Sequence, residues 1–361
     1  MASSNFSLAY MHPGWFTPVM GGIGLALAWW RAAPTMGMPA WWIGVVVGLL
    51  ATLVFVTVAA ISLWRVLKHP AQWRADLAHP VRHAFVAAIP VSMILVSTWL
   101  QALAALLGRG ALTVDGQTVV LSAHWASSLT RLADGLWMLG AVTQLAVSAW
   151  VLHRWWRQGM PLAGVTPVHL IPVVGHVLTP LAGIRLGHHD WALAQFALGT
   201  VLWMMWATLL WQRRRRGPPL PAPLAPARFI QVAPLAVIGL SMAELGWGSV
   251  GPWVAWLMAT VLVLWLTMQL LPQLKTMPFG LSHWALSFPL AAWASLSWML
   301  GHELSSRTGV AGAALLPTAL LAGVTLVLAG LSSATIKGLR RQELLTPEPG
   351  PTPQAPTSSK S

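Results

Sequence analysis

The chain has 361 residues, of which 56% are hydrophobic, only 8% are charged and none is cysteine. Soluble domains average about a quarter charged residues, so this composition, with a mean hydropathy of +0.66, excludes a water-soluble protein and predicts an integral membrane protein. The absence of cysteine excludes disulfides, thiolate metal sites and a cysteine nucleophile.

Ten apolar runs are long enough to cross the hydrocarbon core, which takes about 20 residues of helix. In chain order, we expect spans at 13–30, 41–64, 84–107, 129–152, 165–184, 190–211, 228–247, 253–271, 283–301 and 311–335. No Lys or Arg precedes the first run, so a signal-peptide n-region is absent and we expect the first helix to be retained.

These spans form a single transmembrane domain over residues 11–335, preceded by a short N-terminal segment at 1–10. Within the domain, residues 213–227 read as a basic, proline-rich linker and residues 108–123 as an outer loop. Residues 336–361 are expected to be a tail, largely disordered by composition.

The formal net charge of +13 follows this topology. Most of the 21 Lys and Arg residues fall on the side that holds the N-terminus, the even-numbered loops and the C-terminus. The positive-inside rule therefore places both termini in the cytoplasm. Because topology explains the basic charge, a nucleic-acid partner is not expected.

Prolines repeat in the odd-numbered spans. They are Pro18, Pro90, Pro172, Pro234 and Pro289. Four of them lie six or seven residues after the start of the span, roughly 9–10 Å deep. A proline inside a helix frees a carbonyl one turn earlier, and in a membrane neighbours or a cavity must satisfy it. Prolines are common in membrane helices, but this placement predicts five hairpins, each a kinked inner helix followed by a straight outer one. The predicted fold is an all-α, pseudo-five-fold bundle of ten helices around a central pore.

Several motifs resemble one known family. The segment from His12 to Gly24 (HPGWFTPVMGGIG) resembles the first helix of the tellurite-resistance/dicarboxylate transporter family. That family groups bacterial TehA-type proteins, fungal malate and sulfite permeases and plant slow anion channels. The stretch ALSFPL at 285–290 resembles an aromatic-rich motif of its ninth helix. His79-Pro80 with the following Pro90, and LIPVV at 170–174, look like its third- and fifth-helix motifs.

The resemblance implies a passive or weakly selective anion channel or permease of ten helices in the bacterial inner membrane, usually a homotrimer with one pore per protomer. It also implies that Phe288, beside Pro289, gates the pore. The anion stays open among chloride, nitrate, sulfite, tellurite and C4-dicarboxylates such as malate. The chain departs from the family at Ala233, where relatives often have a second proline, and at His283-Trp284, where an aromatic pair is common.

The residues themselves are compatible with an anion pore. Basic side chains just before the odd spans would form a cytoplasmic mouth that concentrates anions, although each equally suits a lipid headgroup. They are Arg82, Arg157, Arg228 and Lys275. Apart from Glu244, the odd spans have no charge deep inside, which favours weak, fast passage over tight capture. Hydroxyls that can donate to a dehydrating ion include Ser92, Ser97, Ser241 and Ser287.

Two alternatives remain open. One is a proton-coupled dicarboxylate or sulfite exporter of the same fold, since histidine titrates near neutral pH. The other is a haem protein for electron transfer, because His169 and His176 lie seven residues apart on one helix face. A second haem ligand would have to come from another helix, and candidates are His12, His83 and His283. No catalytic constellation is visible, so we expect no enzyme, metal site or cofactor.

Overall fold

The computed structural model describes residues 7–114, 116–309 and 315–346. In these residues, seven helices are long and apolar enough to cross a membrane. They are α2 (Met38–Lys68), Arg82–Leu107, Ala123–Gln158, α8 (His189–Arg216), Ala222–Glu244, Val250–Leu274 and α12 (Leu315–Arg340). A shorter apolar helical stretch covers Pro167–Gly183. The protein is therefore an all-α membrane protein.

Each of the five α-helices that contain a predicted proline follows directly on a 3₁₀ segment. The pairs are η2 (Pro13–Phe16) with α1 (Thr17–Met36), η3 (Arg82–Ala87) with α4 (Ala88–Leu107), η6 (Pro167–Leu170) with α6 (Ile171–Val177), η7 (Ala222–Gln231) with α9 (Val232–Glu244), and η8 (Leu281–Leu286) with α11 (Ser287–Thr308). We call these α-helices the inner helices. Each of the five predicted prolines is the second or third residue of its inner helix. Proline is tolerated there because the first turn has no intrahelical partner for its missing N–H. The prolines therefore mark the change from 3₁₀ to α geometry.

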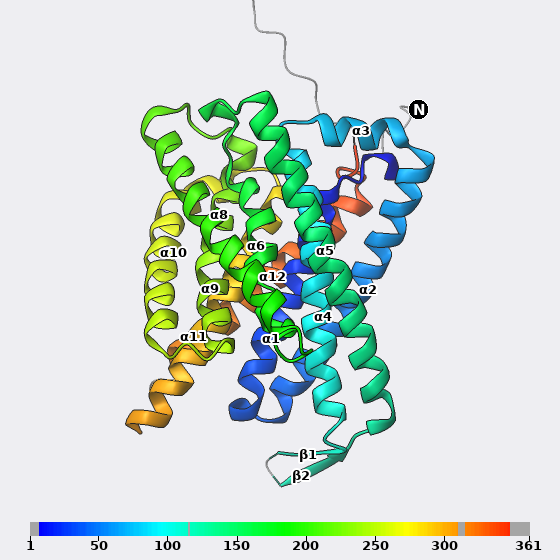
Figure 1. The fold of residues 1–361 in the computed structure, drawn as a ribbon, viewed down its shortest axis with the longest axis vertical. Coiled ribbons are helices and arrows are strands. Elements are labelled where there is room, and N and C mark those ends of the chain that lie inside the picture. The colour runs from blue at the N-terminus through cyan, green and yellow to red at the C-terminus, as the bar shows by residue number, and fades with distance from the viewer. Residues whose placement is uncertain (1–6, 115, 310–314, 347–361) are drawn as a thin grey trace, which may run out of the picture.

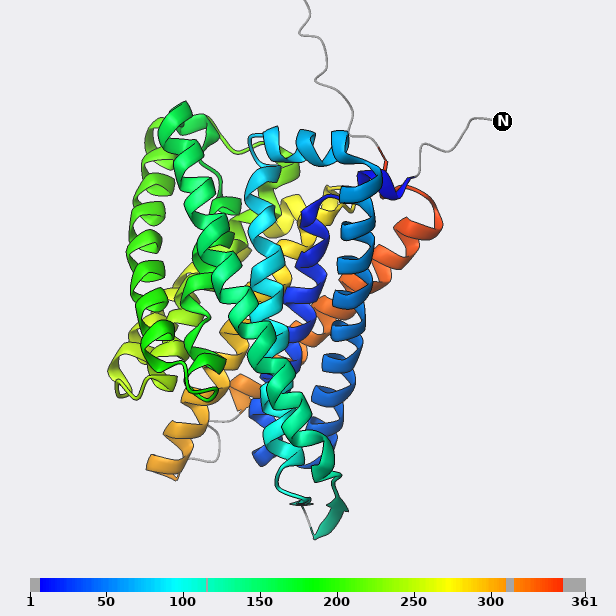
Figure 2. The ribbon, with the colours of Figure 1, turned by 45° about the vertical axis from the view of Figure 1, so that its right-hand side comes forward.

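The inner helices contact one another in a closed ring, in the order α1, α4, α6, α9, α11 and back to α1. Five outer helices surround them: α2, α5 (Ala126–Gln158), α8, α10 (Val250–Thr276) and α12. Each outer helix contacts the inner helix before it and the next inner helix of the ring (Figures 1 and 2). We compared the 18-residue segment of high mean hydropathy in each of these helices. In the stretches that contain α4 and α9, 72% and 83% of this segment is buried, against 22–33% in the outer helices. The ring is thus the core, and the outer helices present apolar side chains to the surroundings.

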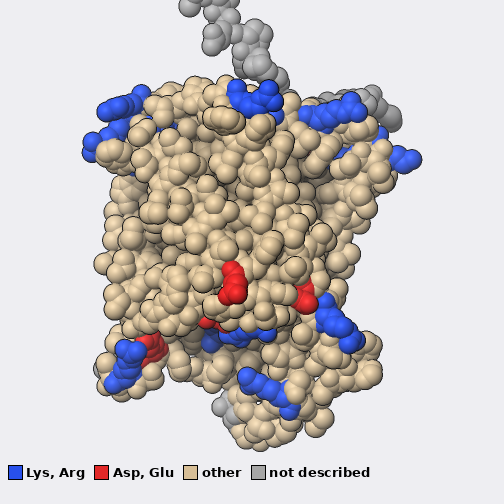
Figure 3. Space-filling view, viewed as in Figure 1, with Lys and Arg blue, Asp and Glu red and all other residues tan. Residues whose placement is uncertain are grey.

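The two ends of the bundle differ. The short helix α3 (Pro70–Ala78) lies across one end, beside η1 (Leu8–Tyr10), and we call this the N-terminal end (Figure 2). At the other end, the hairpin end, β1 (Ala111–Val114) pairs antiparallel with β2 (Gln117–Val120), and η4 (Ala123–Trp125) follows. Figure 3 shows Lys and Arg side chains along the N-terminal end, above a broad uncharged band. The band matches a membrane-embedded surface.

The fifth expected span, 165–184, is broken. Helix α6 ends at Val177, and two residues separate it from the short helix α7 (Pro180–Gly183). Pro180 has no N–H to donate to the carbonyl of His176, and the Thr179 hydroxyl donates to that carbonyl instead, at 2.8 Å. The break is therefore satisfied locally.

Two segments expected outside the helices are more ordered than their composition indicates. Of residues 213–227, α8 takes those up to Arg216, and η7 starts at Ala222. Arg213 donates to the carbonyl of Ala163, at 2.8 Å, beside the short 3₁₀ turn η5 (Leu162–Gly164), which anchors the end of α8. At the C-terminus, the N–H of Ser7 donates to the carbonyl of Leu345, at 3.0 Å. Residues 1–6, 311–314 and 347–361 of the expected segments lie outside the described residues.

Candidate functional site

Three cavities lie in series along the axis of the inner ring. The largest, the vestibule, has a volume of 520 Å³ and is lined at the N-terminal end by His12 just before η2, by the start of α1 and by residues of η3, η7 and η8. A small inner chamber of about 20 Å³ shares Thr17 and Ala285 with the vestibule. An outer chamber of about 30 Å³ follows, lined by all four continuous inner helices and by Leu178 and Leu181 of the broken one.

Phe288 lines both the inner and the outer chamber. Its side chain is buried and it is the second residue of α11. Among the residues that the structure describes, no other is shared by the linings of these two chambers. The aromatic ring is therefore the boundary between the part of the axis that continues into the vestibule and the part that leads toward the hairpin end.

Glycines of α1 bring α11 close enough to seat this ring. A Cβ on Gly24 would lie 3.1 Å from Cδ2 of Phe288, and a Cβ on Gly21 would overlap the side chain of Ser287. Gly22 instead faces Ala51 of α2, where a Cβ would lie 2.8 Å from the Ala51 Cβ. Close packing on small residues is a general means of joining membrane helices, and here it fixes the position of Phe288.

A charged residue lies on the far side of Phe288. Arg31 of α1 lines the outer chamber. Glu244 attracts it and Arg185 repels it, and these two residues form a bidentate ion pair whose second contact, Nη2 to Oε2, is 3.2 Å. Among the described residues Arg31 has no ion pair of its own. Two arginines and one glutamate leave one net positive charge at this end of the axis.

Sequence reasoning missed Arg31 because it assigned the residue to a loop. The first span was expected to end at residue 30, whereas α1 continues to Met36 and includes Pro34 in its last turn. The available signal was the start of the helix: 20 residues counted from Thr17 extend to Met36 and include Arg31.

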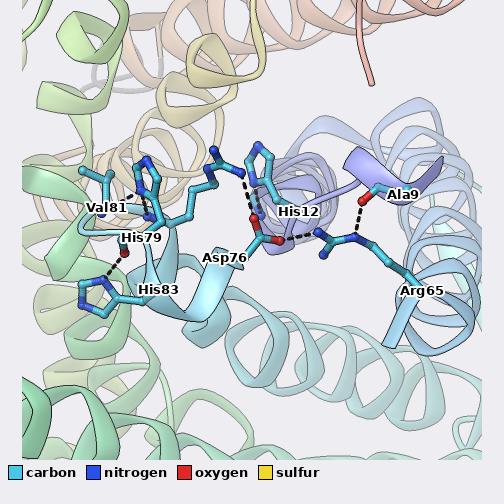
Figure 4. A network of polar contacts seen from close by, with 9 residues as sticks. Ala9, His12, Arg65, Asp76, His79, Val81 and His83 are labelled. Carbon is cyan, nitrogen blue, oxygen red and sulfur yellow. Dashed lines mark hydrogen bonds and ion pairs between the residues drawn. The ribbon is translucent and has the colours of Figure 1, made fainter. Parts of the chain in front are cut away.

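Arg82 is the member of the expected basic mouth that lines the vestibule. Figure 4 shows its neighbourhood: the Asp76 carboxylate lies between two guanidinium groups. Asp76 is 2.9 Å from Arg82 and 2.6 Å from Arg65, with 1% of the aspartate and 3% of Arg65 exposed. Arg65 also donates to the carbonyl of Ala9, at 2.6 Å. The Arg82 charge is therefore partly balanced, and the network fastens α3 to α2 and η3.

The other three basic residues lie elsewhere. Arg228 lines a separate cavity on the flank of the bundle. Arg157 is exposed at the end of α5. Lys275 belongs to the last turns of α10, but its side chain lies outside the described part of the structure. The structure thus brings Arg82 alone of the four to the central axis among the side chains it describes.

The four serines singled out as donors are engaged with the backbone. Their hydroxyls donate to carbonyls: Ser92 to Phe16 at 3.4 Å, Ser97 to Ala133 at 2.7 Å, Ser241 to Val177 at 2.6 Å and Ser287 to Trp284 at 2.6 Å. Since a hydroxyl has one proton, the bonds of Ser92, Ser97 and Ser241 join separate segments of the chain, whereas Ser287 bonds back to the turn before it. The hydroxyl residues that line the cavities are Thr17, Ser282, Thr98 and Ser295.

The histidines singled out in the sequence make hydrogen bonds and ring contacts within the bundle. His176 makes hydrogen bonds to Gln195 and Ser148, both at 2.9 Å, and His169 stacks on Trp206 with ring centroids 5.1 Å apart. Nδ1 atoms accept backbone N–H groups where 3₁₀ segments begin: His12 from Gly14, His79 from Val81, His169 from Thr166 and His283 from Gly280, at 3.1–3.2 Å. The ring of His83 is bound to the His79 carbonyl and to Trp155. In the described residues, no three His, Asp or Glu side chains are placed to hold a metal ion.

An apolar bundle with buried helices around cavities in series is the architecture of a membrane channel or transporter. A family model described as "Voltage-dependent anion channel" (SLAC1) matches residues 10–335, nearly the whole chain. The protein therefore belongs to this family of anion channels and transporters, and the match confirms the family expected from the motifs.

Two kinds of named protein are similar to this chain. The sulfite efflux pumps SSU1 of Arthroderma benhamiae and Trichophyton rubrum are each 22% identical over 339 residues, covering 85% of this chain and 84% of the relative. The tellurite resistance protein TehA homolog of Haemophilus influenzae is 23% identical over 285 residues, covering 78% of this chain and 79% of the relative.

Proposed function

We propose that the protein is a channel or permease that moves small anions along the axis of the inner ring, past a gate formed by Phe288. The observation that carries the proposal is the position of this ring between two chambers, with a 520 Å³ vestibule on one side. A chamber of about 20 or 30 Å³ holds no more than a water molecule or two, so a hydrated ion has to displace the ring to pass.

We propose that the chain crosses the membrane ten times, in five hairpins around this path. The closed ring of five inner helices, each flanked by an outer helix that contacts its two neighbours in the ring, is the contact pattern that a pseudo-five-fold bundle requires. The basic residues at the N-terminal end favour a cytoplasmic location for that end in an inner membrane.

Selection for anions is attributed to Arg31. Its positive charge lies in the outer chamber, directly beyond the gate, in a lining that is otherwise apolar or hydroxylic. A single arginine in a narrow, low-dielectric passage disfavours cations strongly. One cation without a second partner holds an anion weakly, which is compatible with rapid release.

The similarity to sulfite efflux pumps and to a tellurite resistance protein favours small oxyanions as substrates. Sulfite is an oxyanion, and so is tellurite. We therefore propose that the pore accepts inorganic anions of this size, with chloride, nitrate and C4-dicarboxylates as further candidates to be ranked by flux.

Proton-coupled export is a second candidate, favoured by one observation. His12 and His79, which titrate near neutral pH as a residue type, both line the vestibule. Coupled export predicts that an imposed pH gradient drives sulfite against its own gradient in proteoliposomes. A purely passive channel dissipates the sulfite gradient whatever the pH difference.

The gate is tested by anion flux from proteoliposomes. Phe288→Ala should raise chloride flux about tenfold or more, equivalent to a barrier lowered by about 1.4 kcal/mol. Phe85→Ala is the matched control, because it removes the same side chain from the lining of the wide vestibule. Equal flux from wild type and both variants would remove Phe288 from the gate.

Selectivity is tested at Arg31. Arg31→Gln should lower anion flux and reduce the preference for chloride over potassium, and Arg31→Lys should retain it. Arg307→Gln is the control, since it removes the same charge from an exposed site near the end of α11. If both Gln variants behave alike, the charge acts only through the overall surface potential.

A further inference from the structure

Two cavities meet on the flank of the bundle, between the outer helices α8 and α10. The first has a volume of 310 Å³ and lies at the N-terminal end of the bundle, where α8 ends. Arg213, Arg214 and Arg228 line it, together with two glutamines. None of its lining residues is acidic.

The second cavity continues from the first and is mainly apolar, since eight of its ten lining residues are apolar and the other two are Arg214 and Gln231. It has a volume of 430 Å³ and shares Arg214 and Trp265 with the first cavity. Along α8 it is lined by Trp203 and Ala207, one turn apart, and its floor includes Leu235 of the inner helix α9. The result is a groove that starts at a basic pocket and extends along the surface that faces the membrane.

The basic pocket lacks a counter-charge. Arg214 repels Arg228, and the structure gives neither arginine an ion pair among the described residues. Arg214 is held in place by Trp265, with its guanidinium 3.9 Å from the ring centroid. Arg213 is oriented by its hydrogen bonds to the carbonyls of Ala163 and Val165. Cations that repel each other around a polar cavity are stabilised by a bound anion.

The basic pocket and the adjoining apolar groove together indicate the chemical class of the ligand. Arginine guanidinium groups match the geometry of a phosphate, with paired donors. Basic pockets between helices at the cytoplasmic surface are suited to anionic lipid headgroups. A free phosphate would fill the basic pocket but leave the apolar groove empty, whereas a lipid fills both.

We propose that an anionic phospholipid occupies these two cavities, with its phosphate between Arg214 and Arg228 and one acyl chain in the groove between α8 and α10. The lipid would join two outer helices to α9. This site is remote from Phe288 and does not depend on the protein being an anion channel.

The charge requirement is tested by native mass spectrometry of delipidated protein with added lipids. Wild type should bind dioleoyl phosphatidylglycerol in preference to dioleoyl phosphatidylcholine. The double variant Arg214→Gln/Arg228→Gln should bind phosphatidylglycerol roughly thirtyfold more weakly. The control Arg215→Gln/Arg216→Gln removes the same charge from the end of α8 but from residues that line neither cavity. Equal binding of the two lipids, or equal losses in both double variants, would overturn the proposal.

The groove is tested separately with Ala207→Trp, which fills it from an exposed position without changing charge. This variant should lose phosphatidylglycerol binding. Inorganic phosphate, offered alone in a thermal-shift assay, should stabilise wild type far less than the lipid does. If Ala207→Trp binds the lipid as wild type does, or if inorganic phosphate reproduces the full stabilisation, the ligand is a free anion and the lipid site is wrong. Neither assay measures flux, so the result is independent of the gate experiment.

Discussion

Replacing Asp76 by Asn tests the network that closes the N-terminal end of the bundle. The carboxylate is 1% exposed and contacts two arginines, Arg65 and Arg82. Asparagine keeps the size of the side chain but has one oxygen and one amide group that only donates. One arginine in the variant therefore faces another donor, and the charge that balanced both is lost.

The expected cost follows from burial. Breaking a buried ion pair by removing one partner costs about 3–5 kcal/mol, because an uncompensated charge stays behind. Arg65 keeps its bond to the Ala9 carbonyl, and Arg82 is 26% exposed, so water reaches it. We therefore expect the lower end, about 3 kcal/mol. The exposed pair Glu303–Arg307 is a control, for which Glu303→Gln should cost about 0.3–0.5 kcal/mol.

Unfolding in detergent, followed by tryptophan fluorescence, measures the difference. Asp76→Asn should lose several times more stability than Glu303→Gln. Flux is a second readout, because Arg82 lines the vestibule and loses the negative charge of Asp76 beside it. One unit charge at about 7 Å in water is worth about 0.6 kcal/mol, so anion flux per folded protein should rise up to roughly threefold at low salt. Equal stability of the two variants would refute the buried pair, and unchanged flux would refute the role of Arg82 at the vestibule.

Two further predictions concern the packing around the axis. Gly24→Ala places a Cβ 3.1 Å from the Phe288 ring and should change chloride flux. Gly22→Ala faces α2 instead and should alter thermal stability only. Identical flux from Gly24→Ala and wild type would show that the position of the ring does not limit passage. His176→Leu leaves two buried hydrogen-bond partners unsatisfied and should lower the free energy of unfolding by about 1–3 kcal/mol. The control His124→Leu, at an exposed position, should lower it by about 0.5 kcal/mol or less. Similar losses in the two variants would argue against the buried network.

Features that depend on local chemistry were predictable from the sequence. The prolines marked all five inner helices, because a missing N–H restricts where proline stands in any helix. The order of apolar runs likewise indicated the hairpins. Their bounds were not predictable: α2 and α5 extend beyond the expected spans at both ends, since a helix can continue past the hydrocarbon edge.

Features that depend on tertiary contacts were not predictable. Asp76 stands in a short polar segment with no periodic signal, and only the folding of α3 across the bundle brings it to Arg65. The histidines read as possible ligands because their residue type permits it, whereas their ring nitrogens accept backbone N–H groups at the start of 3₁₀ segments. Spacing in a sequence does not distinguish these roles.

The 3₁₀ segments have a mechanical consequence. A 3₁₀ residue advances about 2.0 Å and turns about 120°, against about 1.5 Å and 100° for an α residue. Segment η8 contains six residues and ends two positions before Phe288. Winding it into α form would therefore retract the aromatic ring by about 3 Å and swing it through about 120°. The hydrogen-bond pattern of this short segment thus sets both the depth and the orientation of Phe288, the aromatic side chain that, among the described residues, lines both chambers beyond the vestibule.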